Sequence, residues 1–364
     1  MGLKCGIVGL PNVGKSTIFN SLTSSHAETA NYPFTTIDPN IGMVEVPDER
    51  LSRLAQIYLH KKVTAGMVEF VDIAGLVKGA SRGEGLGNMF LSHIREVDAI
   101  LHIVRCFSDP DVAHISGALN PIDDISLIRT ELLLSDLEII EKQFTTAEKR
   151  VKRGDKDAIH EMAFLKMVRE CLEKGGNIGI GSLSEVEHTY LERYNLLTVK
   201  PLLYVANIDE GKKERSEFYL KQVTEIAQRE GVEVIQVTGK LEAEIASLPD
   251  DERKTFMLEL GILESGLTRL IKASYRLLGL ITFYTVVGGE EIRAWTIKEG
   301  TKAAPTAGKI HSDMERGFIK AEVIHFQDLM LYGTPDAVRE KGLLKIEGRD
   351  YIVKDGDVIH FRFA

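Results

Sequence analysis

The sequence is poor in cysteine and in long apolar runs, and each scarcity argues against a class of protein. Of its 364 residues only three are cysteines, and they stand far apart without a CxxC pair. This usage argues against a disulfide framework or a thiolate metal site, and predicts a reducing compartment. No stretch approaches 18 uninterrupted apolar residues, so we expect no membrane span. The first residues lack the profile of a signal peptide, and a cytoplasmic location is expected.

The chain also lacks an excess of basic residues. Its 45 basic and 54 acidic residues give a formal net charge of −9. We therefore expect no tight binding to duplex DNA, although a local basic face remains open. Apolar residues make up 44% of the chain and charged residues 27%, which excludes a disordered or low-complexity protein.

What the sequence does contain is a series of short apolar runs separated by helix-period stretches. The runs cover Leu3–Val8, Met67–Val71, Ala99–Val104, Pro201–Ala206 and Val232–Val237. Short apolar runs bounded by glycine or charge are typical of buried parallel strands. The pattern predicts a doubly wound α/β sheet.

Between the third and fourth runs the pattern becomes purely helical. From about Ile125 to Glu173 apolar residues recur at heptad-like spacing, interrupted once by Gly154-Asp155. This predicts an antiparallel helical hairpin inserted into the sheet domain. A basic cluster marks its turn, and it fits a solvated helix tip as well as a nucleic-acid contact. The cluster comprises Lys149, Arg150, Lys152, Arg153 and Lys156.

The last segment, from about Leu278 to Ala364, changes character again. Short strand-like runs are separated by Gly/Asp turns, with one helix expected near Ala307–Met314. The predicted unit is a small, separate α+β domain. Its expected strands are Thr282–Val287, Ala294–Thr296, Lys320–Ile324, Leu344–Ile346 and Val358–Phe363.

The strongest motif directly follows the first apolar run. Gly9-Leu-Pro-Asn-Val-Gly14-Lys15-Ser16 has the spacing GxxxxGK[ST] of the phosphate-binding P-loop. In such a loop consecutive backbone N–H groups surround phosphate oxygens at a helix N-terminus. We expect Lys15 to reach the β- and γ-phosphates and the Ser16 hydroxyl to bind Mg²⁺. The other residues expected to line the nucleotide here are Asn12, Val13, Gly14 and Thr17.

A carboxylate closes the second apolar run. Asp72-Ile-Ala-Gly75 is a DxxG motif at a strand end, which after a P-loop indicates the GTPase-like class. Asp72 is expected to hold Mg²⁺ through water. Between the two motifs, Asn31-Tyr-Pro-Phe-Thr35-Thr36 supplies a threonine for the metal, and we favour Thr36 with Thr35 as the alternative.

Two departures from ordinary GTPases follow. Leu76 stands where Ras-type enzymes carry the glutamine that orients the attacking water, so hydrolysis needs another group or is slow. At the base, Asn207-Ile208-Asp209-Glu210 replaces the guanine-specific NKxD, and its Asp is one residue out of register. We expect guanine selectivity to be lost, with Asn207 bonding adenine and Ile208 offering backbone contacts. Thr238 and Gly239 occupy the remaining base-side loop. The alternative, in which Glu210 replaces the Asp of a true GTPase, stays open.

Several longer stretches now make a family resemblance specific. GLPNVGKST, NYPFTTIDPN, VDIAGLVKGAS, GEGLGN, the NIDE variant, GFIKAEV and DYIVKDGDVIHFRF together resemble the YchF family of Obg-like ATPases, of the TRAFAC class. The resemblance runs over essentially the whole chain. It implies an α/β P-loop NTPase (Ras-like G) domain, an inserted helical hairpin and a C-terminal TGS domain of ubiquitin-like β-grasp form. The expected limits are residues 1–124 and 198–277, residues 125–197, and residues 278–364, respectively.

The resemblance also implies roles for single residues. The family places a histidine in a loop as a substitute for the missing glutamine, and His114 matches it. Asn12 resembles the residue that marks K⁺-dependent relatives, so K⁺ is a candidate cation besides Mg²⁺. Phe107 follows its strand where a base could stack, although a core position is equally open.

The expected function is therefore that of a regulatory ATPase. The resemblance implies slow hydrolysis of ATP, weaker binding of GTP, and association with the ribosome and with RNA. Two alternatives remain: a GTP-specific GTPase acting in translation, and a ribosome-docking module in which the nucleotide only locks the shape.

Overall fold

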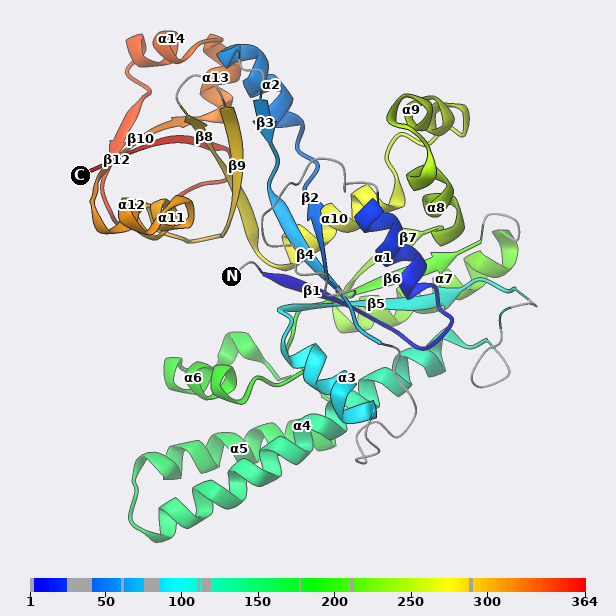
Figure 1. Ribbon diagram of the computed structural model, residues 1–364. Coiled ribbons are helices and arrows are strands. Elements are labelled where there is room, and N and C mark those ends of the chain that lie inside the picture. The colour runs from blue at the N-terminus through cyan, green and yellow to red at the C-terminus, as the bar shows by residue number, and fades with distance from the viewer. Residues whose placement is uncertain are drawn as a thin grey trace.

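The computed structural model describes most of the chain in two sheets with helices around them (Figure 1). The described residues are 3–24, 41–59, 62–74, 86–109, 112, 119–176, 178–209, 213–287 and 291–364.

The first sheet is the nucleotide-type α/β sheet that the apolar runs predict. It has the order β2-β4-β1-β5-β6-β7, parallel throughout except for the antiparallel β2–β4 pair. All eight residues of β5 are buried, as expected for a central strand covered on both faces. The strands are β1 (Lys4–Val8), β2 (Ile41–Glu45), β4 (Met67–Asp72), β5 (Ala99–Cys106), β6 (Leu202–Ile208) and β7 (Glu233–Val237).

Helices cover both faces of this sheet and bury its apolar side chains. α10 has a strongly apolar face, with Leu267, Leu270 and Ile271 in the same core as β1 and β5. The covering helices are α1 (Lys15–Ser24), α3 (Leu86–Arg95), α7 (Lys213–Glu230), α8 (Gly239–Ser247) and α10 (Gly266–Leu277). α9 (Asp250–Glu259) follows α8 and packs against it.

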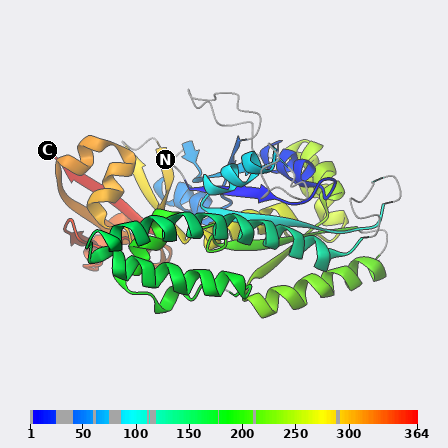
Figure 2. The ribbon, with the colours of Figure 1, turned by 90° about the horizontal axis from the view of Figure 1, so that it is seen from below.

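The helical hairpin between β5 and β6 is confirmed. α4 (Pro121–Lys152) and α5 (Asp157–Glu173) pack along each other, and the chain reverses at Gly154, whose φ is +88°. A positive φ suits glycine, so this residue permits the tight turn. α6 (Glu185–Tyr194) then returns toward the sheet after a short 3-10 turn (Ile180–Ser182). Figure 2 shows α4 passing beneath the first sheet and continuing beyond it.

The second sheet has the order β11-β10-β12-β8-β9-β3. Five of its strands come from the C-terminal segment, close to the strands predicted there. They are β8 (Leu280–Val287), β9 (Glu291–Lys298), β10 (Phe318–His325), β11 (Lys345–Glu347) and β12 (Asp357–Phe363).

The prediction of one helix in this segment was wrong. The helix expected near Ala307–Met314 is split at His311, whose backbone is extended and whose ring accepts a hydrogen bond from the Asp313 N–H. A side-chain cap of this kind starts a new helix. The described helices are α11 (Ala303–Ile310), α12 (Ser312–Arg316), α13 (Phe326–Tyr332) and α14 (Pro335–Glu340).

The sixth strand of the second sheet comes from the N-terminal part of the chain. β3 (Lys62–Thr64) pairs in parallel with β9, and α2 (Glu49–Tyr58) packs Leu51 and Leu54 into the core beside β8 and α13. The chain therefore leaves the first sheet after β2, contributes a helix and a strand to the second, and returns as β4. The pattern of apolar runs did not predict this excursion. The domain limits given above stay a prediction.

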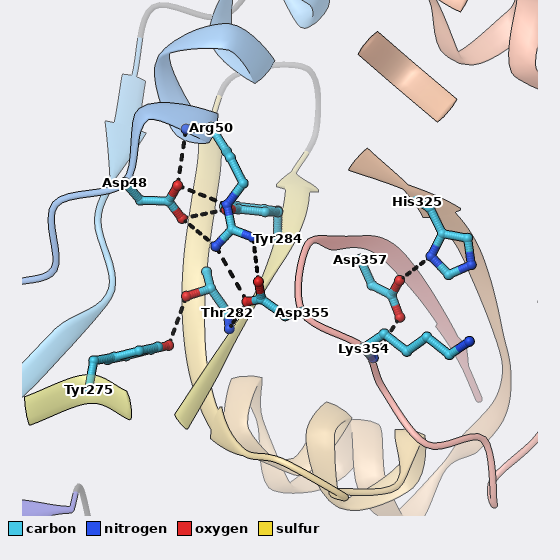
Figure 3. A network of polar contacts seen from close by, with 9 residues as sticks. All are labelled: Asp48, Arg50, Tyr275, Thr282, Tyr284, His325, Lys354, Asp355 and Asp357. Carbon is cyan, nitrogen blue, oxygen red and sulfur yellow. Dashed lines mark hydrogen bonds and ion pairs between the residues drawn. The ribbon is translucent and has the colours of Figure 1, made fainter. Parts of the chain in front are cut away.

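A polar junction of Asp48, Arg50, Tyr284 and Asp355 fixes the start of this excursion (Figure 3). The Asp48 carboxylate caps α2 by accepting the Arg50 backbone N–H at 3.0 Å. The Arg50 guanidinium lies between two carboxylates, 2.9 Å from Asp48 and 2.7 Å from Asp355. The Tyr284 hydroxyl also donates to Asp48. Burial would raise the pKa of Asp48, but the hydrogen bonds from Arg50 and Tyr284 hold it below its usual value.

Candidate nucleotide-binding site

The P-loop connects β1 to α1 in a conformation that only certain residues adopt. Asn12 has a φ of +64° and Gly14 a φ of +96°, so both lie in the left-handed region. A Cβ on Gly14 would stand 2.3 Å from the side-chain nitrogen of Asn207, and one on Gly9 would stand 2.7 Å from the Ile103 carbonyl. The motif glycines therefore permit both the turn and the close packing of the loop onto the strand ends.

Lys15, the first residue of α1, is almost fully buried. Only 8% of it is exposed, and its ammonium donates to the Leu10 carbonyl at 2.8 Å. Burial lowers the pKa of Lys15, and the charge of Asp72 offsets part of that shift. A buried ammonium held by one carbonyl is poorly compensated for its lost hydration, so phosphate oxygens would be strong additional partners.

Ser16 and Asp72 form the polar pair expected at a metal site. The Ser16 hydroxyl donates to Asp72 Oδ2 at 3.0 Å, joining the start of α1 to the end of β4. Asp72 Oδ1 is buried and has no hydrogen-bond partner among the described residues. Burial raises the pKa of Asp72, against the opposing effects of Ser16 and Lys15.

This donor set fits Mg²⁺. The ion prefers one or two protein oxygens and completes its shell with water and phosphate, so an orphaned carboxylate beside a hydroxyl is suitable. Within the described residues no group of three or more His, Cys, Asp or Glu side chains could hold a metal alone. A metal at this site would therefore depend on the nucleotide for further ligands.

A cavity of about 250 Å³ adjoins the P-loop on the side where a base would lie. Eight residues expected at the nucleotide line it: Asn12, Gly14, Thr17, Phe107, Asn207, Ile208, Thr238 and Gly239. The P-loop, the end of β6 and the start of α8 therefore meet at one place. Its other lining residues are Asp109, Val112, Asp209 and Lys240.

The Asn207 amide has a structural role in addition to the predicted contact with adenine. The side chain is 5% exposed; its nitrogen donates to the Val13 carbonyl at 2.9 Å, and its oxygen accepts the Gly239 N–H at 3.0 Å. Asn207 therefore connects the P-loop to the base-side loop. These contacts leave the second N–H of the amide unused, and Asn207 lines the cavity, so the direct contact with adenine stays a prediction.

Phe107 lies at the cavity rather than in the core. Its ring is half-buried, and the Arg105 guanidinium lies 4.5 Å from its centre. Arg105 also donates to the carbonyls of Phe107, Asp109 and Val112, at 3.1 to 3.3 Å. This buried arginine, which the sequence analysis missed, shapes the loop after β5. The available signal was a charged residue inside an otherwise apolar strand.

An ion pair at the cavity was also not predicted from the sequence. Lys240 forms an ion pair with Asp109 at 3.0 Å, joining the start of α8 to the loop after β5. The lysine side chain is 80% exposed, so the pair contributes little to stability. The pair matters because both residues line the cavity, so it holds the loop after β5 and the start of α8 next to each other there.

Several residues of the motifs discussed above lie outside the described part of the chain: Thr35, Thr36, Gly75, Leu76, His114 and Glu210. The basic cluster at the hairpin turn is described, and two of its members pair with acids. Arg150 bonds Asp155 and Glu161, and Lys152 lies 3.0 Å from Glu148.

The chain is similar to known protein families and to known proteins. The family YchF-GTPase_C, described as "Protein of unknown function (DUF933)", matches residues 280–364. The family described as "50S ribosome-binding GTPase" matches residues 4–151. The "Ribosome-binding ATPase YchF" of Bacillus subtilis (strain 168) is 52% identical, with 100% of both chains covered. The chain belongs to the YchF family.

Other relatives agree with this assignment. The "Ribosome-binding ATPase YchF" of Escherichia coli O157:H7 is 51% identical, covering 100% of this chain and 99% of the relative. The "Structure of the Schizosaccharomyces pombe YchF GTPase" matches with a TM-score of 0.90 at 38% identity, over 99% of this chain and 98% of that one. The resemblance and the fold class predicted from the sequence are thereby confirmed. None of the described helices of this YchF-family chain is long and apolar enough to cross a membrane.

Proposed function

We propose that this YchF-family chain binds ATP together with Mg²⁺, hydrolyses it slowly to ADP and phosphate, and uses its nucleotide state to control association with the ribosome. Relatives matched over their whole length carry the name "Ribosome-binding ATPase YchF". The single structural observation that carries the nucleotide chemistry is the buried, unpartnered Asp72 Oδ1 beside the P-loop hydroxyl of Ser16.

The chain's own residues have distinct roles in this proposal. Lys15 exchanges its bond to the Leu10 carbonyl for the β- and γ-phosphate oxygens, which compensate its buried charge better. Ser16, Asp72 and Thr36 would hold Mg²⁺, directly or through water. The bound ion would supply positive charge at the phosphate oxygens. Backbone N–H groups of the P-loop surround the phosphates.

The base-side wall argues against selectivity for GTP. The Asp209 and Glu210 pair does not reproduce the register of a guanine-specific motif, and Asn207 is engaged with Val13 and Gly239. The base then contacts Phe107 by stacking, the backbone of Ile208, and the loop at Thr238 and Gly239. Without side-chain pairing to guanine N1–H and N2–H₂, discrimination in favour of GTP disappears.

Water activation is assigned to His114. A neutral imidazole can orient or deprotonate water near the γ-phosphate, in place of the glutamine that Leu76 replaces. K⁺ beside Asn12 is proposed as a further source of positive charge. RNA is proposed as a local contact, because the net charge of −9 disfavours extended binding along a duplex.

A GTPase is the second candidate. The matched structure is titled a "YchF GTPase", and the family matching residues 4–151 is described as a "50S ribosome-binding GTPase". In that case Glu210 performs the role of the displaced aspartate. Base preference separates the two candidates.

The test is a titration of the nucleotide-free full chain with fluorescent ATP and GTP analogues in K⁺ and Mg²⁺, checked with unlabelled competitors. We expect ATP to bind at least tenfold more tightly, which corresponds to about 1.4 kcal/mol. Tighter binding of GTP would replace the ATPase by the GTPase.

A second assay tests the partner. Purified ribosomes are sedimented with the chain in the presence of ATP, ADP or no nucleotide, while phosphate release is measured in parallel. Nucleotide-dependent co-sedimentation with slow turnover supports the proposal. Strong nucleotide dependence without any turnover would make the chain a docking module, and no co-sedimentation in any state would contradict the ribosomal role.

A further inference from the structure

A second cavity lies between the first sheet and the helical hairpin, apart from the nucleotide site. Its volume is about 280 Å³, close to the lower end for small-molecule sites. Apolar side chains from α4, including Ile128 and Leu132, face apolar side chains from β5 and β6, including Ile100 and Leu202. Among the described residues, none lines both this hairpin cavity and the base-side cavity.

One polar side chain in the hairpin cavity lacks a partner. His102, in the middle of β5, is 3% exposed and lines the cavity. Within the described residues its ring contacts Tyr204, with centroids 5.5 Å apart, but forms no hydrogen bond. Burial lowers the pKa of His102 to about 3, so the imidazole is neutral and offers one donor and one acceptor. Buried polar groups are nearly always hydrogen-bonded, so a partner is expected from within the cavity.

The charged groups around the cavity already have hydrogen-bond partners. Arg129 pairs with Glu230 and donates to the Gly175 carbonyl at 3.0 Å, while the Tyr204 hydroxyl donates to Glu230 at 2.7 Å. The Lys200 ammonium donates to three oxygens, among them the Val97 carbonyl at 2.7 Å. These groups have no need of a charged ligand, so the occupant is neutral.

A neighbouring groove adjoins the cavity. An open groove of about 410 Å³, bordered by Arg229 and Ile226 of α7, shares part of its wall with the cavity. The Arg129–Glu230 pair lies at this shared wall and separates the two spaces. Opening of this pair would give a small molecule a route to His102 that does not pass the P-loop.

From these observations we infer that the hairpin cavity is a binding site for a small neutral molecule. The ligand is largely apolar, of one or two rings, and carries one hydrogen-bonding group that pairs with the His102 imidazole. Apolar walls from α4, β5 and β6 enclose its body. The site does not depend on the proposed nucleotide chemistry.

Indole and indene make a matched pair of probes, because they share shape and differ chiefly in the N–H group. Each is titrated calorimetrically into the full chain saturated with ADP, so that stacking on Phe107 cannot contribute. We expect indole to bind and indene to bind at least tenfold more weakly. His102→Leu should remove this difference between the probes. Leu132→Trp, which fills the cavity, should abolish binding of both.

Crystals soaked with indole locate the molecule independently of the variants. Density for indole beside His102 supports the site. Absence of indole binding to the full chain, binding that Leu132→Trp leaves unchanged in a folded protein, or density elsewhere would overturn the inference. If His102→Leu fails to fold, the indole-to-indene ratio and the soaked crystal decide the question without it.

Discussion

Replacing Asn207 by alanine separates two roles that this residue could have. The substitution leaves the Val13 carbonyl and the Gly239 N–H without their side-chain partner in a buried place. Each unsatisfied buried group costs about 1–3 kcal/mol, so the two together cost about 2–6 kcal/mol of stability. The lost stability is that of the contact between the P-loop and the base-side loop.

Nucleotide binding then has to order these loops again. Fixing the backbone of a single residue costs about 1–2 kcal/mol, which corresponds to roughly a 5- to 30-fold loss of affinity. Since the amide connects two loops that both nucleotides would contact, we expect ATP and GTP to lose affinity by the same factor. Asn20→Ala, at an exposed position of α1, is the control and should change neither affinity.

The assay measures Kd for ATP and GTP with each variant, together with urea unfolding to establish that the protein is folded. An equal loss for both nucleotides supports the linking role. A loss confined to ATP, with GTP affinity unchanged, would refute this reasoning and restore Asn207 as the residue that reads adenine.

Four further predictions address other parts of the molecule. Lys15→Ala should abolish tight nucleotide binding in the same titration, and retained affinity would contradict the P-loop assignment. His114→Ala should lower phosphate release while leaving ATP affinity nearly intact; unchanged turnover would remove His114 from the mechanism. Arg105→Met should weaken ATP binding at least tenfold because the loop at Phe107 loses three hydrogen bonds, and Arg105→Lys should recover part of it. Asp48 has a folded pKa below its unfolded value, so its stabilising effect is present above about pH 4 and is lost as pH falls through the folded pKa. Asp48→Asn should therefore lower the free energy of unfolding at pH 7 but have a smaller effect near pH 3, as measured by urea unfolding; equal effects at both pH values would contradict it.

The sequence predicts those parts of the fold that depend on the order of neighbouring residues, such as apolar runs and the spacing of glycines. The run Ala99–Val104 is apolar at every position except His102, and the strand there is buried on both faces. The P-loop follows from spacing alone, because backbone groups form it and only glycine permits its close contacts.

What the sequence does not predict depends on partners far along the chain. Asn207 bonds the Val13 carbonyl, 194 positions away, and no feature of the local sequence reports that contact. Likewise Lys62–Thr64 is a three-residue strand whose partner lies at residues 291–293. A strand this short carries too little pattern to be recognised, and only tertiary pairing defines it.

The excursion of the chain into the second sheet has a consequence during biosynthesis. The Thr64 hydroxyl bonds Glu291, which is made 227 residues later. At translation rates of roughly 5–20 residues per second, the segment waits about 10–50 s for its partner strand. During that time Leu51 and Leu54 of α2 lack the core that buries them in the finished protein. The second sheet is therefore completed last, and the nascent chain carries an exposed apolar helix until its final quarter has emerged.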